Sequence, residues 1–130
     1  MATWITARVL ELTYTAHDLA PYARDLDDHG PPFVWEPGRR ELIRAELDAA
    51  YFQLYGLVRD DVEYVLDTFA VLREREERAH GEYRTKRLVL DWYDAMTRAI
   101  HLNQPYLPAL HPAPGQGQRH SGSGVCCNQP

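Results

Sequence analysis

The string from Gly81 to Arg87 gathers three cations, an aromatic ring and a hydroxyl group at the predicted start of the last helix. The first turn of a helix offers free backbone amides and the positive end of the helix dipole, both of which favour an anion. Arg84, Lys86 and Arg87 could therefore contact phosphates, and Thr85 adds a further donor. These four residues are the candidate DNA-binding residues.

A second interpretation of the same string is structural. The Glu-rich segment directly before it supplies carboxylates with which the cations can pair, and Glu82 stands four residues before Lys86, as in an ion pair on a helix surface. Arg73 to Arg78 alternate in sign, which is typical of a solvated helix face.

No other group of residues has the types and spacing of a catalytic or metal site. A metal-dependent nuclease needs Glu-x-Lys after an acidic residue, but Lys86 is the only lysine and arginine stands at position 84. The six histidines never occur at i, i+4 or beside a cysteine, which disfavours zinc. Asp27-Asp28 and Asp60-Asp61 fit loops and helix caps better than acid–base work. We therefore predict neither catalytic residues nor metal ligands.

Composition narrows the class of protein further. The chain has 130 residues and 45% hydrophobic content, which suits one domain with a core. Nineteen acidic and 14 basic residues give a net charge of -5, so any contact with DNA must come from a local basic patch. No apolar run is long enough for a membrane span or a signal peptide, which predicts a cytoplasmic location. Cys126 and Cys127 are adjacent and near the end, where they cannot staple a core.

Hydrophobic periodicity predicts an all-α fold. Apolar residues recur at helical spacing in five segments, at residues 3–15, 18–28, 37–56, 60–80 and in a last helix that runs through Leu102 and ends before Pro105. Asp18 is expected to cap the second helix. Gly56 and Gly81 are expected to end the third and fourth.

Between the second and third helices, consecutive prolines in the segment from His29 to Trp35 force an extended loop. We expect Phe33 and Trp35 to pin it onto the helices. From Pro105 onward the chain is rich in Pro, Gly, Gln and Ser and nearly uncharged, which is typical of disorder. The expected organisation is a small orthogonal bundle of about five helices over residues 1–104, followed by a disordered tail over residues 105–130.

Three strings in this order carry a family resemblance. Arg44 to Leu57, Asp61 to Phe69 and Gly81 to Arg87 resemble the C-terminal region of large bacterial adenine-N6 DNA methyltransferases. These include fused restriction-modification enzymes and the methylases of phage-defence systems. The strings Leu10 to Ala16 and Gly30 to Phe33 fit the same region, so the resemblance covers about residues 5–98.

The resemblance implies methylation of adenine in DNA with S-adenosylmethionine as the cofactor of the parent enzyme. This segment would follow the catalytic and target-recognition regions, which together with DNA are its implied partners. The glycine-rich cofactor turn and the Asn/Asp-Pro-Pro-aromatic motif of such enzymes have no counterpart here. The nearest string, Gly30-Pro31-Pro32-Phe33, lacks the amide or carboxylate that would hold the target base. Ala70 to Leu72 also replaces a proline-containing segment of the family.

Two functional hypotheses follow from these patterns. The first is a non-catalytic C-terminal segment of an adenine-N6 methyltransferase, not active alone, that supports DNA target recognition or domain packing. The alternative is a stand-alone helical module for protein–protein interaction. Its motivation is the cluster of aromatic residues at Tyr51, Phe52, Tyr55 and Tyr64. An Asn-Pro-Pro-Tyr-type motif encoded immediately upstream would decide for the first.

Overall fold

The computed structural model describes residues 2–121, in which six α-helices and one short 3-10 helix form. The all-α fold expected from the sequence is confirmed. Residues 2–121 form no β-strand, and their only β-type pairing is an isolated antiparallel bridge between Phe33 and Arg119. The chain divides into two compact units, which we describe separately. Unit 1 comprises residues 1–36 and 110–130, and unit 2 comprises residues 37–109.

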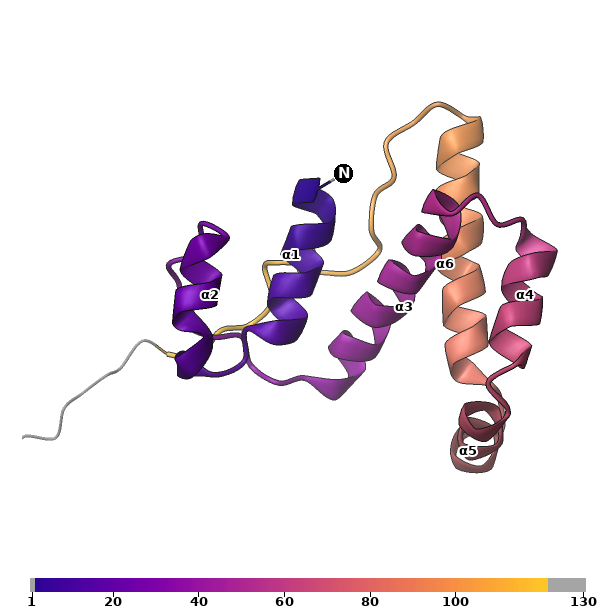
Figure 1. Cartoon of the computed structure of the whole chain (residues 1–130), viewed down its shortest axis with the longest axis horizontal. Coiled ribbons are helices and arrows are strands. Elements are labelled where there is room, and N and C mark those ends of the chain that lie inside the picture. Colours follow the sequence, from indigo (N-terminus) through magenta and orange to yellow (C-terminus); the bar gives the residue numbers. More distant parts are fainter. Residues whose placement is uncertain (1, 122–130) are drawn as a thin grey trace, which may run out of the picture. The chain divides into compact units, whose positions relative to one another are not determined.

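Unit 1 begins with helix α1 (Ala2–Thr13), followed by η1 (His17–Leu19) and α2 (Ala20–Asp25). Its core is small and consists of Leu10, Tyr14, Ala23 and Phe33, with Ala20 and Leu26 packed against them. In Figure 1, α1 and α2 lie side by side and the C-terminal segment of the described chain passes close to both. Two short helices alone bury little apolar surface, so this unit needs further contacts.

The C-terminal segment supplies those contacts through backbone hydrogen bonds. The Val34 amide donates to the Gln118 carbonyl at 2.8 Å, and the His120 amide donates to the Pro32 carbonyl at 2.9 Å. Gly115, which adopts a positive φ of 86°, donates its amide to Glu11 Oε2 at 2.7 Å.

This arrangement differs from the expected disordered tail over residues 105–130. Segments of low apolar content can still order when their backbone groups find partners, and here the partners are supplied by the proline-rich loop. Residues 110–121 are thus part of unit 1. The rest of the expected tail, residues 122–130, lies outside the described residues.

Unit 2 is built from four consecutive helices, α3 (Pro37–Leu54), α4 (Arg59–Asp67), α5 (Ala70–His80) and α6 (Arg84–His101). Figure 1 shows α6 between α3 and α4, while α5 is seen end-on and so lies across them. Gln53 Nε2 on α3 donates to the Tyr93 carbonyl at 3.2 Å and to Thr97 Oγ1 at 2.6 Å on α6. The Tyr93 hydroxyl donates to the Leu57 carbonyl at 2.7 Å. Helix α6 is therefore the central helix of this unit.

The single helix predicted over residues 60–80 is wrong, because two helices form there. The Thr68 hydroxyl and amide both donate to the Val65 carbonyl, at 2.6 and 3.1 Å, and Phe69 leaves the helical region with φ -85° and ψ 62°. The resulting bend lets α5 contact α6 as well. Gly81 ends α5 in the left-handed conformation, with φ 76°, as the sequence predicts.

Three smaller expectations also need correction. Phe33 is buried as predicted, but Trp35 is 60% exposed because the hydrogen-bonded pairing of this loop ends at Val34. Asp18 lies within η1 and makes no capping hydrogen bond. The last helix does not run through Leu102: α6 ends at His101, and Leu102 follows it at an exposed position.

Candidate functional site

The four candidate DNA-binding residues occupy the first turn of α6, as expected from the sequence. The residue before them, Tyr83, is buried and donates its hydroxyl to the Leu66 carbonyl at 2.9 Å. Burial raises the pKa of Tyr83, and the nearby carboxylates of Glu76 and Asp67 raise it further. The neutral phenol thus fixes the start of α6 against the end of α4.

The anion position at this helix N-terminus is already filled from within the chain. The Thr85 amide donates to Glu76 Oε2 at 2.8 Å, and the Thr85 hydroxyl donates to Glu76 Oε1 at 2.6 Å. These are the donors that the sequence analysis assigns to a phosphate. A carboxylate from α5 therefore takes the place of an external anion and caps the helix.

The three cations of the string also have carboxylate partners. Lys86 Nζ lies 2.9 Å from Asp67 Oδ1 and 3.6 Å from Glu63 Oε2. Arg87 pairs with Glu82 at 3.1 Å and with Asp91 at 3.5 Å, and Arg84 pairs with Glu41 at 3.3 Å. The expected pair of Glu82 with Lys86 is wrong.

Instead of Lys86, Arg87 holds Glu82. Hydrogen bonds from the Arg87 guanidinium lower the pKa of the Glu82 carboxyl. The pair stays charged at neutral pH, which keeps this guanidinium engaged.

The charge around the string favours the structural interpretation over the phosphate-binding one. Three cations face six carboxylates, which are Glu41, Glu63, Asp67, Glu76, Glu82 and Asp91. A phosphate would meet this excess of negative charge and would have to displace ion pairs that are already formed. DNA contact through these residues stays a prediction, and the local geometry does not favour it.

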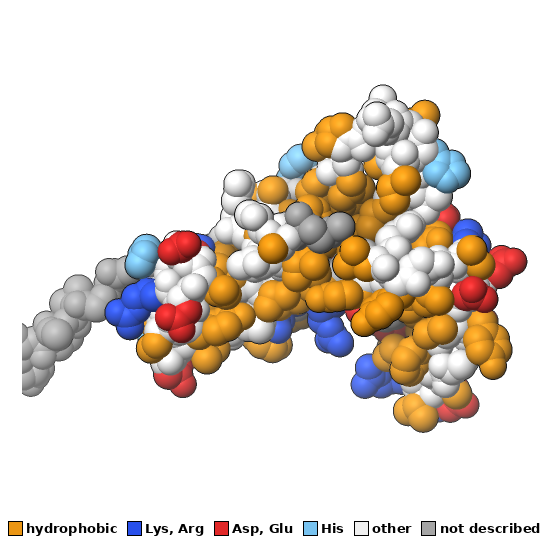
Figure 2. Space-filling view, turned by 45° about the horizontal axis from the view of Figure 1, so that its top comes forward, with side chains coloured by type: hydrophobic (Ala, Val, Ile, Leu, Met, Phe, Trp, Pro, Cys, Tyr) orange, Lys and Arg blue, Asp and Glu red, His pale blue; other side chains and the backbone are white. Residues whose placement is uncertain are grey.

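Unit 2 carries many large apolar side chains at its surface, and Figure 2 shows hydrophobic side chains gathered on the face in view. Tyr55 is 80% exposed and Tyr64 is 73% exposed. The others lie at the ends of α3 and α6, near the turn between α4 and α5, and in the segment after α6: Tyr51, Leu54, Val58, Phe69, Val71, Ile100, Leu102 and Leu107. These side chains lie outside the core that α3, α4 and α6 share.

Residues 2–121 offer neither a metal site nor a membrane-spanning helix. No group of three or more His, Cys, Asp or Glu side chains in that range is placed to hold a metal ion. No helix in the same part of the chain is long and apolar enough to cross a membrane. Cys126 and Cys127 lie outside the described residues.

Unit 1 contains a polar cluster that no sequence pattern indicates. Arg119 donates to Asp28 at 2.8 and 2.5 Å and to the Pro31 carbonyl at 2.8 Å, and its guanidinium lies 3.9 Å from the Phe33 ring centroid. We call this cluster the Arg119 clasp. No local pattern predicts it, because Asp28 and Arg119 are 91 residues apart. It joins the C-terminal segment of unit 1 to the loop that follows α2.

Comparisons of the whole chain with protein-family models, with curated proteins and with solved structures found no match.

Proposed function

We propose that this chain is a non-catalytic helical module whose unit 2 packs against other protein segments. The setting we propose is the C-terminal region of an adenine-N6 DNA methyltransferase in the cytoplasm, where S-adenosylmethionine and the catalytic residues belong to the rest of the enzyme. Between the two roles expected from the sequence, target recognition and domain packing, we propose domain packing.

The exposed apolar side chains of unit 2 carry this proposal. Single apolar residues on a surface are ordinary, but several large ones close together are typical of surfaces that another protein covers. Tyr51, Leu54, Tyr55 and Val58 are such a group, at the end of α3 and directly after it. Tyr55 and Tyr64 are aromatic residues of the kind enriched at interfaces. The engaged cations of the Arg84 to Arg87 string support the same choice, because they leave little positive charge for DNA.

The three strings that resemble the methyltransferase region also fall within one unit. Arg44 to Leu57 covers most of α3 and the turn after it. Asp61 to Phe69 covers α4 except its first two residues, and Gly81 to Arg87 joins α5 to α6. The two shorter strings, Leu10 to Ala16 and Gly30 to Phe33, lie in unit 1, so unit 2 carries the longer part of the resemblance. This supports a structural role for unit 2. The stand-alone interaction module remains the second candidate, favoured by the same exposed aromatic side chains.

A titration of duplex DNA with the chain, followed by fluorescence anisotropy, separates packing from DNA contact. At about 50 mM and about 200 mM salt we expect no binding that weakens steeply with salt, because phosphate contacts are the source of such a dependence. Arg84→Ala with Arg87→Ala is expected to change nothing. Binding that falls with salt and is weakened by this double variant would reject the packing role in favour of DNA contact.

The proposed place in a methyltransferase is tested by reading the open reading frame immediately upstream and by purifying its product. We expect an Asn-Pro-Pro-Tyr-type motif there, and co-purification of that product with this chain. Tyr55→Arg with Tyr64→Arg should abolish the co-purification, whereas Arg98→Glu, at an exposed position on α6, is the matched control. An upstream frame without such a motif would leave the stand-alone module as the better description.

A further inference from the structure

Helix α5 is the least covered helix of unit 2. None of its 11 residues is buried, and its contacts with α6 are made through a side that includes the half-buried Leu72 and Glu76. An isolated helix of this length is only marginally stable in water. One side of α5 is therefore supported by the unit, while the opposite side is open.

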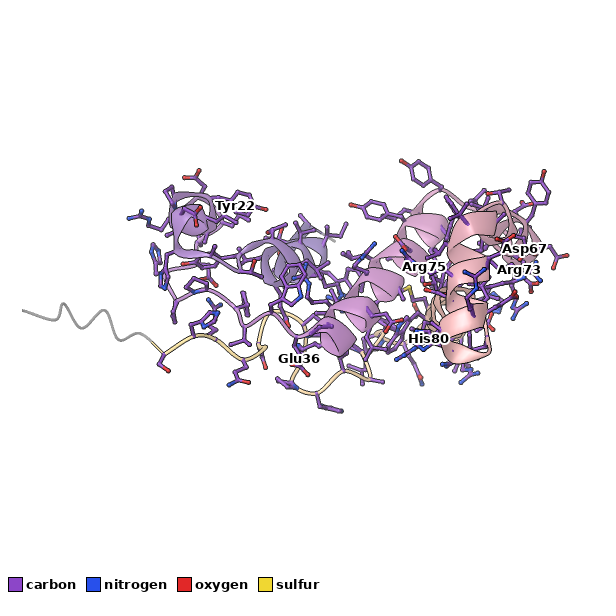
Figure 3. All side chains as sticks on the ribbon, turned by 90° about the horizontal axis from the view of Figure 1, so that it is seen from below. Tyr22, Glu36, Asp67, Arg73, Arg75 and His80 are labelled. Carbon is purple, nitrogen blue, oxygen red and sulfur yellow. The ribbon has the colours of Figure 1, made fainter. Side chains whose placement is uncertain are left out.

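The open side has a regular pattern. Val71, Glu74, Arg75 and Arg78 stand at i, i+3, i+4 and i+7 and share one face of the helix, and all four are exposed. We call these residues the α5 face. Figure 3 shows Arg75 on the opposite side of α5 from Arg73.

The charges of the α5 face lack partners within the part of the chain that the structure describes. There, Glu74, Arg75 and Arg78 make no hydrogen bond or ion pair, although acidic residues outnumber basic ones by 19 to 14. Other cations of the chain do find carboxylates, as Arg73 does with Glu77 at 2.8 Å. What distinguishes the α5 face is that free charges of both signs stand side by side on it.

Apolar surface adjoins these charges. A shallow groove of about 490 Å³ lies at the turn between α4 and α5, and its lining is mostly apolar: Thr68, Phe69, Ala70, Val71, Leu72 and Arg75. Val71 is 82% exposed. The face thus combines unpaired charges of both signs with apolar surface that is left open to solvent.

We propose that the α5 face binds the same face of a second copy of this chain, with the two helices antiparallel about a two-fold axis. In this register, Glu74 lies opposite Arg75 of the second copy, and the symmetry repeats the pair. Arg78 lies opposite Val71 of the second copy, where its aliphatic stem covers the apolar side chain. Symmetric dimers require such a self-complementary surface.

The contact is small, since 11 residues of helix extend only about 16 Å. Such a pair buries less than a standard stable interface, so we expect a weak dimer with a dissociation constant of about 10 µM to 1 mM. This inference rests on the proposed packing role of unit 2, and it identifies a second copy of this chain as one of the proteins that unit 2 binds.

Sedimentation equilibrium of the full chain over this concentration range tests the proposal. Glu74→Arg and Arg75→Glu each put like charges opposite each other, so each should weaken association by about tenfold or more. The double variant, Glu74→Arg with Arg75→Glu, should restore it. Arg98→Glu changes the net charge by the same amount as Arg75→Glu and should sediment like the unaltered chain.

Mixing supplies a second measurement. The Glu74→Arg chain and the Arg75→Glu chain have complementary faces, so an equimolar mixture should associate although neither variant does alone. Circular dichroism of each variant confirms that it has folded. A chain that is monomeric throughout, or single variants that associate as the unaltered chain does, would overturn α5 pairing. Failure of the packing role itself would instead appear as salt-dependent DNA binding.

Discussion

The two units of this molecule are assembled in opposite ways. Unit 2 takes one continuous stretch of chain, and its helices follow one another and pack around α6. Unit 1 takes its residues from both ends of the chain, and a segment without helices closes it. Bringing together segments that are distant in the chain costs more loop entropy than packing neighbouring helices. In unit 1 a few specific contacts of the C-terminal segment must offset this cost. Unit 2 is held instead by many apolar contacts between neighbouring helices.

The Arg119 clasp concentrates that dependence. One guanidinium joins a carboxylate, a carbonyl and an aromatic ring of the loop that follows α2. In unit 2, by contrast, the links between α3 and α6 are spread along buried apolar surface and include hydrogen bonds such as those of Gln53. Disturbing the chain end should therefore affect the units unequally.

The largest effect is expected from a chain that ends at Ala109. Loss of the segment that contacts Glu11, Pro32 and Val34 should expose the small core of unit 1, and hydrogen-exchange protection in α1 should fall to the level of an unfolded segment. The amides of α3 and α6 should keep their protection. Equal loss of protection in both units would contradict the division into two units.

A single substitution should reproduce part of this effect. Arg119→Ala removes the hydrogen bonds and leaves the Asp28 carboxylate, which is largely buried, without its cation, so we expect unit 1 to lose about 2 kcal/mol. The change is measured by native-state hydrogen exchange of α1. Arg98→Ala, at an exposed position in unit 2, should stay within about 0.5 kcal/mol of the unaltered chain.

A smaller effect is expected from acid. The hydrogen bond from Arg119 is the largest cause that lowers the pKa of Asp28. Because the folded pKa lies below the unfolded value, this contribution to stability is complete above a pH of about 4 and is lost as the pH falls through the folded pKa. The exchange protection of α1 should therefore fall more steeply with acid in the unaltered chain than in Asp28→Asn. Parallel pH profiles would show that Asp28 does not contribute.

The sequence did not predict the division into two units, but it predicted the helices at both ends of unit 2, α3 and α6, for a physical reason. Residues three and four apart share a helix face, so the buried positions Ile43, Leu47, Leu88 and Met96 can be recognised locally. The bend at Thr68 was missed, because apolar spacing continues through it and only the packing of α5 against α6 selects the break. The candidate string was placed correctly at the start of α6, but its pairing with Glu41, more than 40 residues away, was not foreseeable.

What the sequence determined by itself is therefore local. It determined most of the helices and the glycines that end α3 and α5. Tertiary structure decided which charges are engaged and which are not, because ion pairs such as Asp28 with Arg119 join residues far apart in the chain. It also decided that the cations at the start of α6 face carboxylates, while those of the α5 face remain unpaired within the described chain. Periodicity reports which side of a helix is apolar, and only folding supplies the neighbour that covers it.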